Sequence, residues 1–195
     1  MQLPTARSAR VDILLEGSLT STGGGVASSC TLIRDGDRAI VVDPGMAPSA
    51  ASILDPLAAL GVRPEDVTDV VLSHHHPDHT LYAGLFPNAA VHDHWAIYRG
   101  TDWEDSECDG RVLAPSVLLV RTPGHTAEDL ATVVGTPDGV VVCTHSWFNS
   151  ETRVDDESPE DHLALHDARA AILEVADTII PGHGPAFRPT ADTPR

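Results

Sequence analysis

The sequence predicts one α/β domain in which β-sheets are covered by helices. The chain has 195 residues, which is enough for one full hydrophobic core, and 42% of its residues are hydrophobic. Strand pairs come first along the chain, a strand–loop–helix unit follows, and the same order then returns, as in α/β layered folds. No internal repeat or low-complexity linker interrupts the sequence. These observations together predict a single layered domain.

The first half of the chain carries strand signals separated by turn residues. Apolar and β-branched runs predict a first strand at residues 11–17 and a hairpin at 28–45, with its turn at Asp35-Gly36-Asp37. A further run predicts a short buried strand at 67–73. Residues 49–60 have helical composition, although Pro56 is expected to kink or shorten that helix. The buried strand leads directly into a run of histidines.

The second half repeats this alternation. We expect a short helix at residues 81–86, an edge strand at 89–94 and an acidic polar loop at 101–110. Three strands should follow at 116–122, 129–135 and 139–145, and a final strand with its turn at 176–185. Ser158 is expected to cap the last helix, with Pro159 at its first position and Asp161 completing a capping box. That helix should run to about Val175.

The composition excludes several functions. The formal charge is −17, and none of the basic residues is a lysine. A Schiff-base lysine and a P-loop lysine are therefore excluded, and nucleic acid is disfavoured as a partner. Cys30, Cys108 and Cys143 form no CxxC pair, so we expect neither a disulfide framework nor a cysteine-rich zinc module. The N-terminal residues lack a secretory apolar region and no stretch could span a membrane, which predicts a cytoplasmic protein without membrane contact.

Histidines follow four short apolar runs. They lie in the cluster SHHHPDH (73–79), in TPGH at His125, in CTH at His145 and in PGH at His183. Strand ends at one edge of a sheet share a surface, so we expect these residues to converge. His74 and His76 are two residues apart and face the same way in an extended segment, whereas Asp78 and His79 can face a second position. Imidazole and carboxylate together suit Zn²⁺, Mn²⁺ or Fe²⁺, so the sequence predicts a metal site.

This motif set resembles that of the metallo-β-lactamase fold superfamily, and its short single-domain members in particular. The resemblance covers nearly the whole chain, including the strand that ends in Val42-Asp43-Pro44-Gly45. It implies an αββα sandwich, with residues 1–195 forming one domain and the site at one edge. It also implies the roles of individual residues: His74, His76 and His125 would bind a first metal, Asp78, His79 and His183 a second, and Asp43 would support the ligands from behind.

His145 departs from the family pattern. Members usually carry an aspartate that bridges the two metals at this point, within the stretch VVVCTHSWF (140–148). A carboxylate can ligate two ions at once, whereas a neutral imidazole offers one lone pair. Three interpretations stay open: a pair of ions bridged by hydroxide alone, one tight ion with a weak or absent second, and a His145 that lines the pocket without binding metal.

Several other residues carry weaker signals. His75 is expected to point away from the metals, and Cys143 to be a buried small hydrophobic residue. The remaining candidates each have a functional and a structural interpretation. His92 and His94 could line the rim of the pocket or belong to an edge strand, and His162 and His166 could bind a metal as a pair or lie on the helix surface. Trp103 could belong to an acidic lid or to a solvated loop, and Trp147 and Phe148 could form a wall of the cleft or pack in the core.

The leading hypothesis for function is a metal-dependent hydrolase. It would use a metal-bound hydroxide, oriented by Asp78, on a small-molecule ester, lactone or phosphodiester. Zinc, as one or two ions, is the expected cofactor, with iron or manganese as alternatives. The absence of lysine disfavours β-lactam hydrolysis, because some β-lactamases of this superfamily grip the substrate carboxylate with a lysine. The sequence does not predict an oligomeric state.

Two alternatives remain. The first is a mononuclear non-haem iron oxygenase of the persulfide dioxygenase kind, with His74 or His76, His125 and His145 as ligands. The second is a catalytically silent metal-binding domain that acts as an interaction module.

Overall fold

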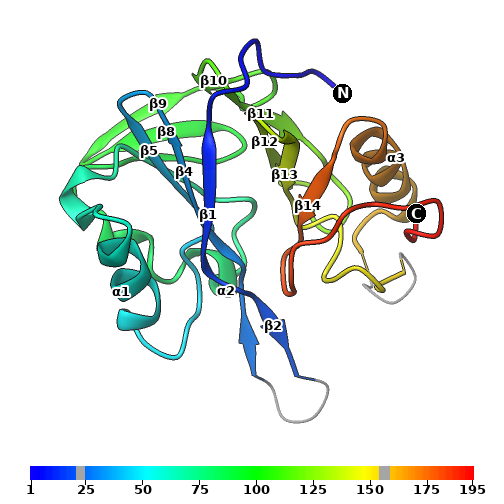
Figure 1. The fold of residues 1–195 in the computed structure, drawn as a ribbon, viewed down its shortest axis with the longest axis horizontal. Coiled ribbons are helices and arrows are strands. Elements are labelled where there is room, and N and C mark those ends of the chain that lie inside the picture. The colour runs from blue at the N-terminus through cyan, green and yellow to red at the C-terminus, as the bar shows by residue number, and fades with distance from the viewer. Residues whose placement is uncertain (21–24, 154–158) are drawn as a thin grey trace.

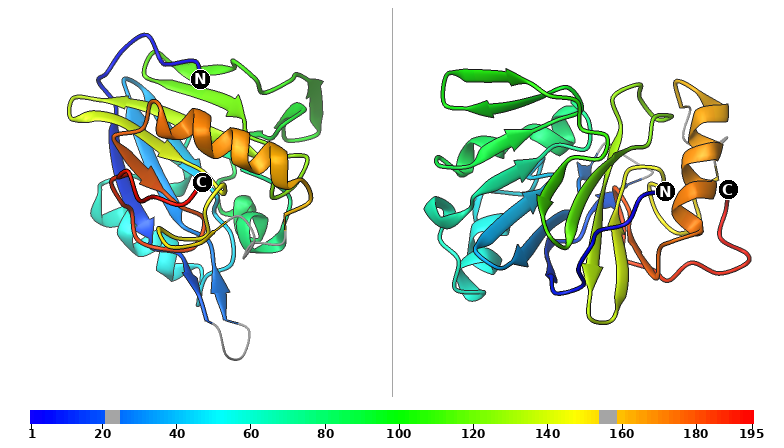
Figure 2. Two further views of the ribbon diagram at one scale, coloured as in Figure 1. Left: turned by 90° about the vertical axis from the view of Figure 1, so that its right-hand side faces the viewer. Right: turned by 90° about the horizontal axis from the view of Figure 1, so that it is seen from above.

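Two β-sheets pack face to face, and one helix covers the outer face of each, in the computed structural model of the protein (Figures 1 and 2). The structure describes residues 1–20, 25–153 and 159–195. This arrangement is the αββα sandwich that the resemblance implies, and the predicted fold class is confirmed.

The first sheet contains seven strands over the described residues, in the order β1-β4-β5-β6-β7-β8-β9. They are β1 (Arg10–Leu15), β4 (Cys30–Asp35), β5 (Arg38–Val42), β6 (Asp69–Val71), β7 (Ala90–His92), β8 (Ala96–Arg99) and β9 (Asp102–Asp105). The predicted hairpin is confirmed, because β4 and β5 pair antiparallel on either side of Gly36. Strands β5, β6 and β7 run parallel to one another.

The second sheet has the order β10-β11-β12-β13-β14 in the described part of the chain. Its strands are β10 (Val112–Ala114), β11 (Val117–Arg121), β12 (Leu130–Thr136), β13 (Gly139–Cys143) and β14 (Thr178–Ile180), and β13 and β14 are parallel. A small separate ribbon pairs β2 (Ser18–Leu19) with β3 (Val26–Ala27).

The sheets have apolar residues on both faces because each is covered on both sides. In β4, Leu32 packs toward helix α1 (Ala51–Ala59), and the next residue, Ile33, packs between the sheets. In β12, Val133 packs toward helix α3 (His162–Leu173), while Val134 again faces the other sheet. Alternation with a period of two along each strand thus builds three apolar layers.

Helix α1 contains Pro56 in its interior and ends at Ala59, three residues later, in agreement with a helix shortened by proline. The remaining helical segments are short: α2 (Pro77–Thr80), the 3-10 helix η1 (Pro64–Asp66) and the 3-10 helix η2 (Ala83–Leu85), which replaces the expected helix at 81–86. None of the helices among the described residues has the length and apolar character needed to cross a membrane.

The beginning of the last helix differs from the prediction. Helix α3 begins at His162, and Asp161 caps it by accepting hydrogen bonds from the backbone N–H groups of Leu163 and Ala164. Ser158, the predicted cap, lies outside the described residues. The backbone N–H of Glu160 donates to the carbonyl of His125, and that of Asp161 to Gly124. These contacts hold residues 160 and 161 against the loop that carries His125, so the helix begins after them.

The sheet edge also differs from the prediction. Strand β7 is interior, because β8 and β9 extend the first sheet beyond it. The acidic segment expected to form a loop therefore includes strand β9, all of whose residues are exposed. Trp103 on this strand is 62% exposed and packs its ring edge-on against Tyr98, 4.8 Å between centroids. It forms part of the outer strand pair rather than of a lid.

Candidate metal centre

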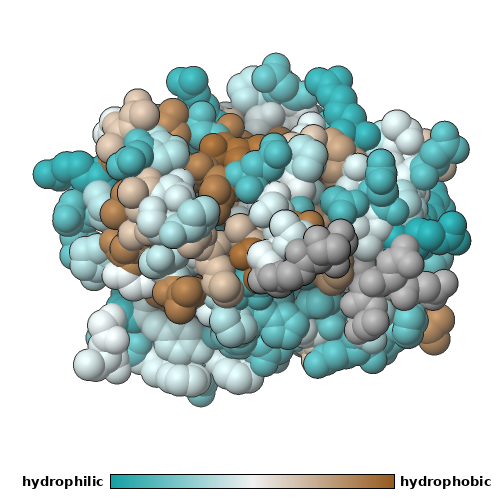
Figure 3. Space-filling view, turned by 90° about the horizontal axis from the view of Figure 1, so that it is seen from below, coloured by the Kyte–Doolittle hydropathy of each residue, from teal (hydrophilic) through white to brown (hydrophobic). Residues whose placement is uncertain are grey.

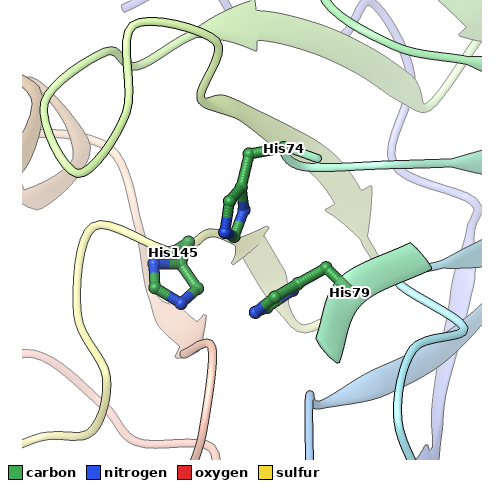
Figure 4. Close-up of side chains that lie close together, drawn as sticks. All are labelled: His74, His79 and His145. Carbon is green, nitrogen blue, oxygen red and sulfur yellow. The ribbon is translucent and has the colours of Figure 1, made fainter. Parts of the chain in front are cut away.

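The predicted site residues lie where strands of both sheets end. His74 and His76 follow β6, and Asp78 and His79 lie in the short helix α2. His125, His145 and His183 come from the loops after β11, β13 and β14. Figure 4 shows the rings of His74, His79 and His145 converging from three separate segments. We call the seven residues together the histidine cluster.

His74, His76 and His125 form one group of the histidine cluster. Their ligand atoms all lie within 4.8 Å of one another. Nδ1 of His76 lies 2.9 Å from Nε2 of His74 and 3.2 Å from Nε2 of His125. Three imidazole nitrogens therefore face one point.

Asp78, His79 and His183 form a second group with the same spread of ligand atoms. Oδ2 of Asp78 lies 3.5 Å from Nε2 of His79 and 3.4 Å from Nε2 of His183. One carboxylate and two imidazoles thus face a second point.

His145 lies between the two groups. Its ring centroid is 4.6 Å from that of His74 and 4.6 Å from that of His79, and its Nε2 is 3.0 Å from Nε2 of His183. With His74 and His79 it forms a further compact group of ligand atoms. The ring of His145 fits here because residue 182 is a glycine: a Cβ atom at Gly182 would lie 2.9 Å from His145 Nε2.

The outer nitrogens of three rings are held by fixed oxygen atoms. Nδ1 of His74 lies 3.0 Å from Ser73 Oγ, and Nδ1 of His79 lies 2.8 Å from Asp43 Oδ2. Nδ1 of His183 lies 3.0 Å from the carbonyl oxygen of Ala27. Metal-binding histidines are commonly oriented this way, with the outer ring nitrogen bonded to a carboxylate or carbonyl and the inner one directed at the ion.

Burial favours the neutral form of four imidazoles of the cluster. It lowers the pKa of His125 to about 4, and neighbouring imidazoles lower it further. The pKa values of His74, His145 and His183 are lowered for the same first reason. Neutral rings carry the free lone pair that a metal ion needs.

Three ring nitrogens in this cluster lack a hydrogen-bond partner among the described residues. They are Nε2 of His79, Nδ1 of His125 and Nδ1 of His145, and all three are buried. A buried polar atom without a partner is unfavourable, and a divalent ion bound by such a nitrogen removes that cost. The donor set therefore fits one or more divalent transition-metal ions.

Sequence reasoning missed three contributors. Ser73 and the Ala27 carbonyl orient ligands as described above, and buried Asp129 lies 4.0 Å from Nδ1 of His74. Burial raises the pKa of Asp129 to about 7, opposed by its hydrogen bonds from Thr126. An acidic residue at the start of an apolar strand is the signal that could have identified Asp129.

Of the residues with weaker sequence signals, some lie at the cluster and others pack elsewhere. His92 is buried and bonds to Asp69 instead of lining the site, and Trp147 packs in the core under α3. Phe148 faces the cluster, with its ring centroid 5.1 Å from that of His145. Cys143 is buried, and burial raises the pKa of its thiol to about 12.

The surface near the site combines polar and apolar character. Figure 3 shows the lower side of the molecule in Figure 1, where hydrophobic residues gather among hydrophilic ones. A surface pocket of about 320 Å³ beside His76 is lined by His75, His76, Thr126, Ala127, Glu128 and Glu160. Two carboxylates therefore border one approach to the cluster.

Comparison with known proteins agrees with the fold and the motif. The sequence model of the metallo-beta-lactamase superfamily matches residues 23–185. The chain is 39% identical to Metallo-beta-lactamase domain-containing protein 1 of Xenopus laevis, covering 91% of this chain and 81% of that protein. It is 26% identical to an N-acyl homoserine lactonase of Bacillus cereus, covering 70% of this chain and 71% of that one.

A solved structure extends the comparison to the fold. A Thermotoga maritima protein described as a metallo-beta-lactamase superposes with a TM-score of 0.73 at 20% identity. The match covers 94% of this chain and 100% of that one. From the family match, the level of identity and the shared fold, the chain belongs to the metallo-beta-lactamase superfamily.

Proposed function

We propose that this protein is a metal-dependent hydrolase of small neutral esters or lactones. The observation that supports this best is the histidine cluster itself, in which two groups of ligand atoms face adjacent points and the outer nitrogens of three rings are held by oxygen atoms. In the proposal, His74, His76 and His125 hold one divalent ion. Asp78, His79 and His183 hold the other, and His145 contributes its ring between them.

A divalent ion in such a site lowers the pKa of a water molecule and polarises a carbonyl oxygen. The residues of the chain supply the orientation. Asp78 has a second carboxylate oxygen that can accept a hydrogen bond from the attacking water and direct its lone pair at the substrate. Asp43 fixes the ring of His79, and Ser73 fixes that of His74. The ring of Phe148 packs beside that of His145 and adds an apolar surface to the site.

Charge supports a neutral substrate rather than a phosphodiester. The chain has a formal charge of −17, and Glu128 and Glu160 border the pocket next to His76. An anionic substrate would meet repulsion on approach, whereas an ester or lactone would not. The Bacillus cereus relative is named as a lactonase, which gives lactones priority in a first assay.

The oxygenase alternative would use His125 and His145 together. Their ring centroids lie 4.2 Å apart, but no group of three ligand atoms within 4.8 Å among the described residues contains both. The two complete groups of ligand atoms therefore rank the hydrolase first.

The test is hydrolysis by protein loaded with Zn²⁺ or with Mn²⁺. Three substrates are compared: an N-acyl homoserine lactone, a p-nitrophenyl ester and bis(p-nitrophenyl) phosphate. We expect turnover of the lactone or the ester, a loss of at least about 100-fold in kcat/KM for His76→Gln and for Asp78→Asn, and no change for the exposed control His166→Gln. Turnover of the phosphodiester alone, or equal rates in all variants, would overturn the proposal.

A further inference from the structure

A second set of metal-ligating side chains lies outside the histidine cluster. Ligand atoms of His75, His94 and Glu128 all lie within 4.8 Å of one another. The three residues come from the loop after β6, the turn between β7 and β8, and the loop between β11 and β12. His75 and Glu128 also line the pocket of about 320 Å³. None of the three belongs to the ligand sets already described.

His75 contacts a carboxylate at each ring nitrogen. Its Nδ1 lies 2.6 Å from Glu128 Oε2, and its Nε2 lies 3.2 Å from Asp93 Oδ2. These contacts direct Nδ1 of His75 and a carboxylate oxygen of Glu128 to one place, where both atoms could bind the same cation.

Asp93 is held in place for this role. Its Oδ1 accepts the backbone N–H groups of Trp95 and Ala96, and its Oδ2 accepts the hydroxyl of Tyr98. Asp93 is also buried. A fixed, buried carboxylate behind a histidine is the arrangement that orients metal-binding imidazoles in known sites.

His94 supplies the third ligand. Burial lowers the pKa of His94, so its ring is neutral near pH 7, and its buried Nδ1 has no hydrogen-bond partner in the part of the chain that the structure describes. The ring packs against Trp95, with 4.3 Å between centroids, and lies 5.9 Å from the ring of His75. Its position beside His75 is therefore fixed by packing.

We propose that His75, His94 and Glu128 form a separate peripheral site for a divalent transition-metal ion of the zinc, nickel or copper class. Two imidazoles and a carboxylate suit such ions and leave coordination positions open to water. The side chains of His75 and Glu128 are 37% and 31% exposed, so the ion is held more weakly than one in the buried histidine cluster. This site does not depend on the proposed hydrolase activity.

The test uses Ni²⁺ as the probe and the protein with whatever metal it carries on purification. Equilibrium dialysis against increasing NiCl₂, followed by elemental mass spectrometry, counts added nickel and resident metal separately. The variants are His94→Gln and Glu128→Gln, and the matched control is Glu65→Gln, an exposed carboxylate outside every group of ligand atoms among the described residues.

We expect one weakly bound Ni²⁺ per chain in the wild type and in the control. In both site variants, the Ni²⁺ concentration that fills half of this weak site should rise at least about tenfold. The content of resident metal should not change. Equal nickel binding in all four proteins would overturn the proposal. So would a loss of resident metal in both site variants, because the three residues would then belong to the histidine cluster.

Discussion

Oδ2 of Asp43 lies 2.8 Å from Nδ1 of His79, while Oδ1 of the same carboxylate accepts the backbone N–H of Ser73 at 2.7 Å. One buried side chain thus fixes both the ring of a proposed ligand and the start of the histidine motif. Asp43 adopts a left-handed backbone conformation, with φ of 50°, which Asp and Asn tolerate better than most residues. This geometry at the end of β5 turns the carboxylate toward the motif.

Replacing Asp43 with asparagine should weaken metal binding without unfolding the protein. The amide oxygen can still accept the N–H of Ser73, but the amide N–H₂ then faces Nδ1 of His79. His79 would have to carry its proton on Nε2, the nitrogen directed at the metal. We expect affinity for the ion held by His79 to fall about 10- to 100-fold, measured by competition with a chelator. Asp12→Asn, which removes a surface ion pair with Arg34, is the control and should leave affinity unchanged.

Replacing His145 with aspartate should tighten binding of the second ion. Aspartate offers two oxygens and a negative charge between the two groups of ligands, whereas histidine offers one neutral lone pair. We expect the weaker dissociation constant to fall about tenfold, which corresponds to about 1.4 kcal/mol. His145→Asn has the shape of aspartate without its charge. Tightening by both variants, or by neither, would contradict this account of His145.

Replacing Gly182 with alanine tests whether the position of His145 matters. The added methyl group would lie 2.9 Å from His145 Nε2 and would displace the ring. We expect the free energy of unfolding to fall by about 1–3 kcal/mol because of overpacking, with weaker metal binding. Urea unfolding and chelator competition measure the two effects. Gly84→Ala is the control, because a Cβ atom at Gly84 meets nothing within 4 Å.

The metal-free protein should lose stability in mild acid. The pKa of His125 falls to about 4 in the folded chain through burial, and those of His145 and His183 are lowered as well. Below the unfolded value of 6.5, these histidines bind protons in the unfolded chain but not in the folded one, so acid favours unfolding. Asp129, whose folded pKa is raised to about 7, contributes in the opposite direction but is a single group. The stabilisation is fully present above about pH 6.5 and declines toward pH 4. Urea unfolding of chelator-treated protein that is unchanged between pH 7 and pH 5 would contradict this expectation.

Much of the fold could be predicted because local patterns determine it. The β4–β5 hairpin follows from apolar runs around a Gly-containing turn, and the placement of His125, His145 and His183 follows from the strands that precede them. The αββα arrangement itself came from the family resemblance and not from periodicity.

The remaining features depend on contacts between distant parts of the chain. Strand β9 forms because its exposed polar residues pair with β8, and the start of α3 is set by the loop that carries His125. The contact of His75 with Glu128 joins residues 53 positions apart, which no local pattern reveals. Tertiary pairing outweighed local propensity at each of these places.

The most direct test of the histidine cluster as a hydrolytic metal centre is the metal content of the purified protein. Elemental mass spectrometry on protein prepared without added metal and without a metal-chelating tag gives the ions per chain. The peripheral site is too weak to retain an ion under these conditions. The two complete groups of ligand atoms predict two equivalents of zinc or manganese, both lost in a variant that combines His76→Gln with His79→Gln. A single equivalent, or iron in place of zinc and manganese, would contradict the account.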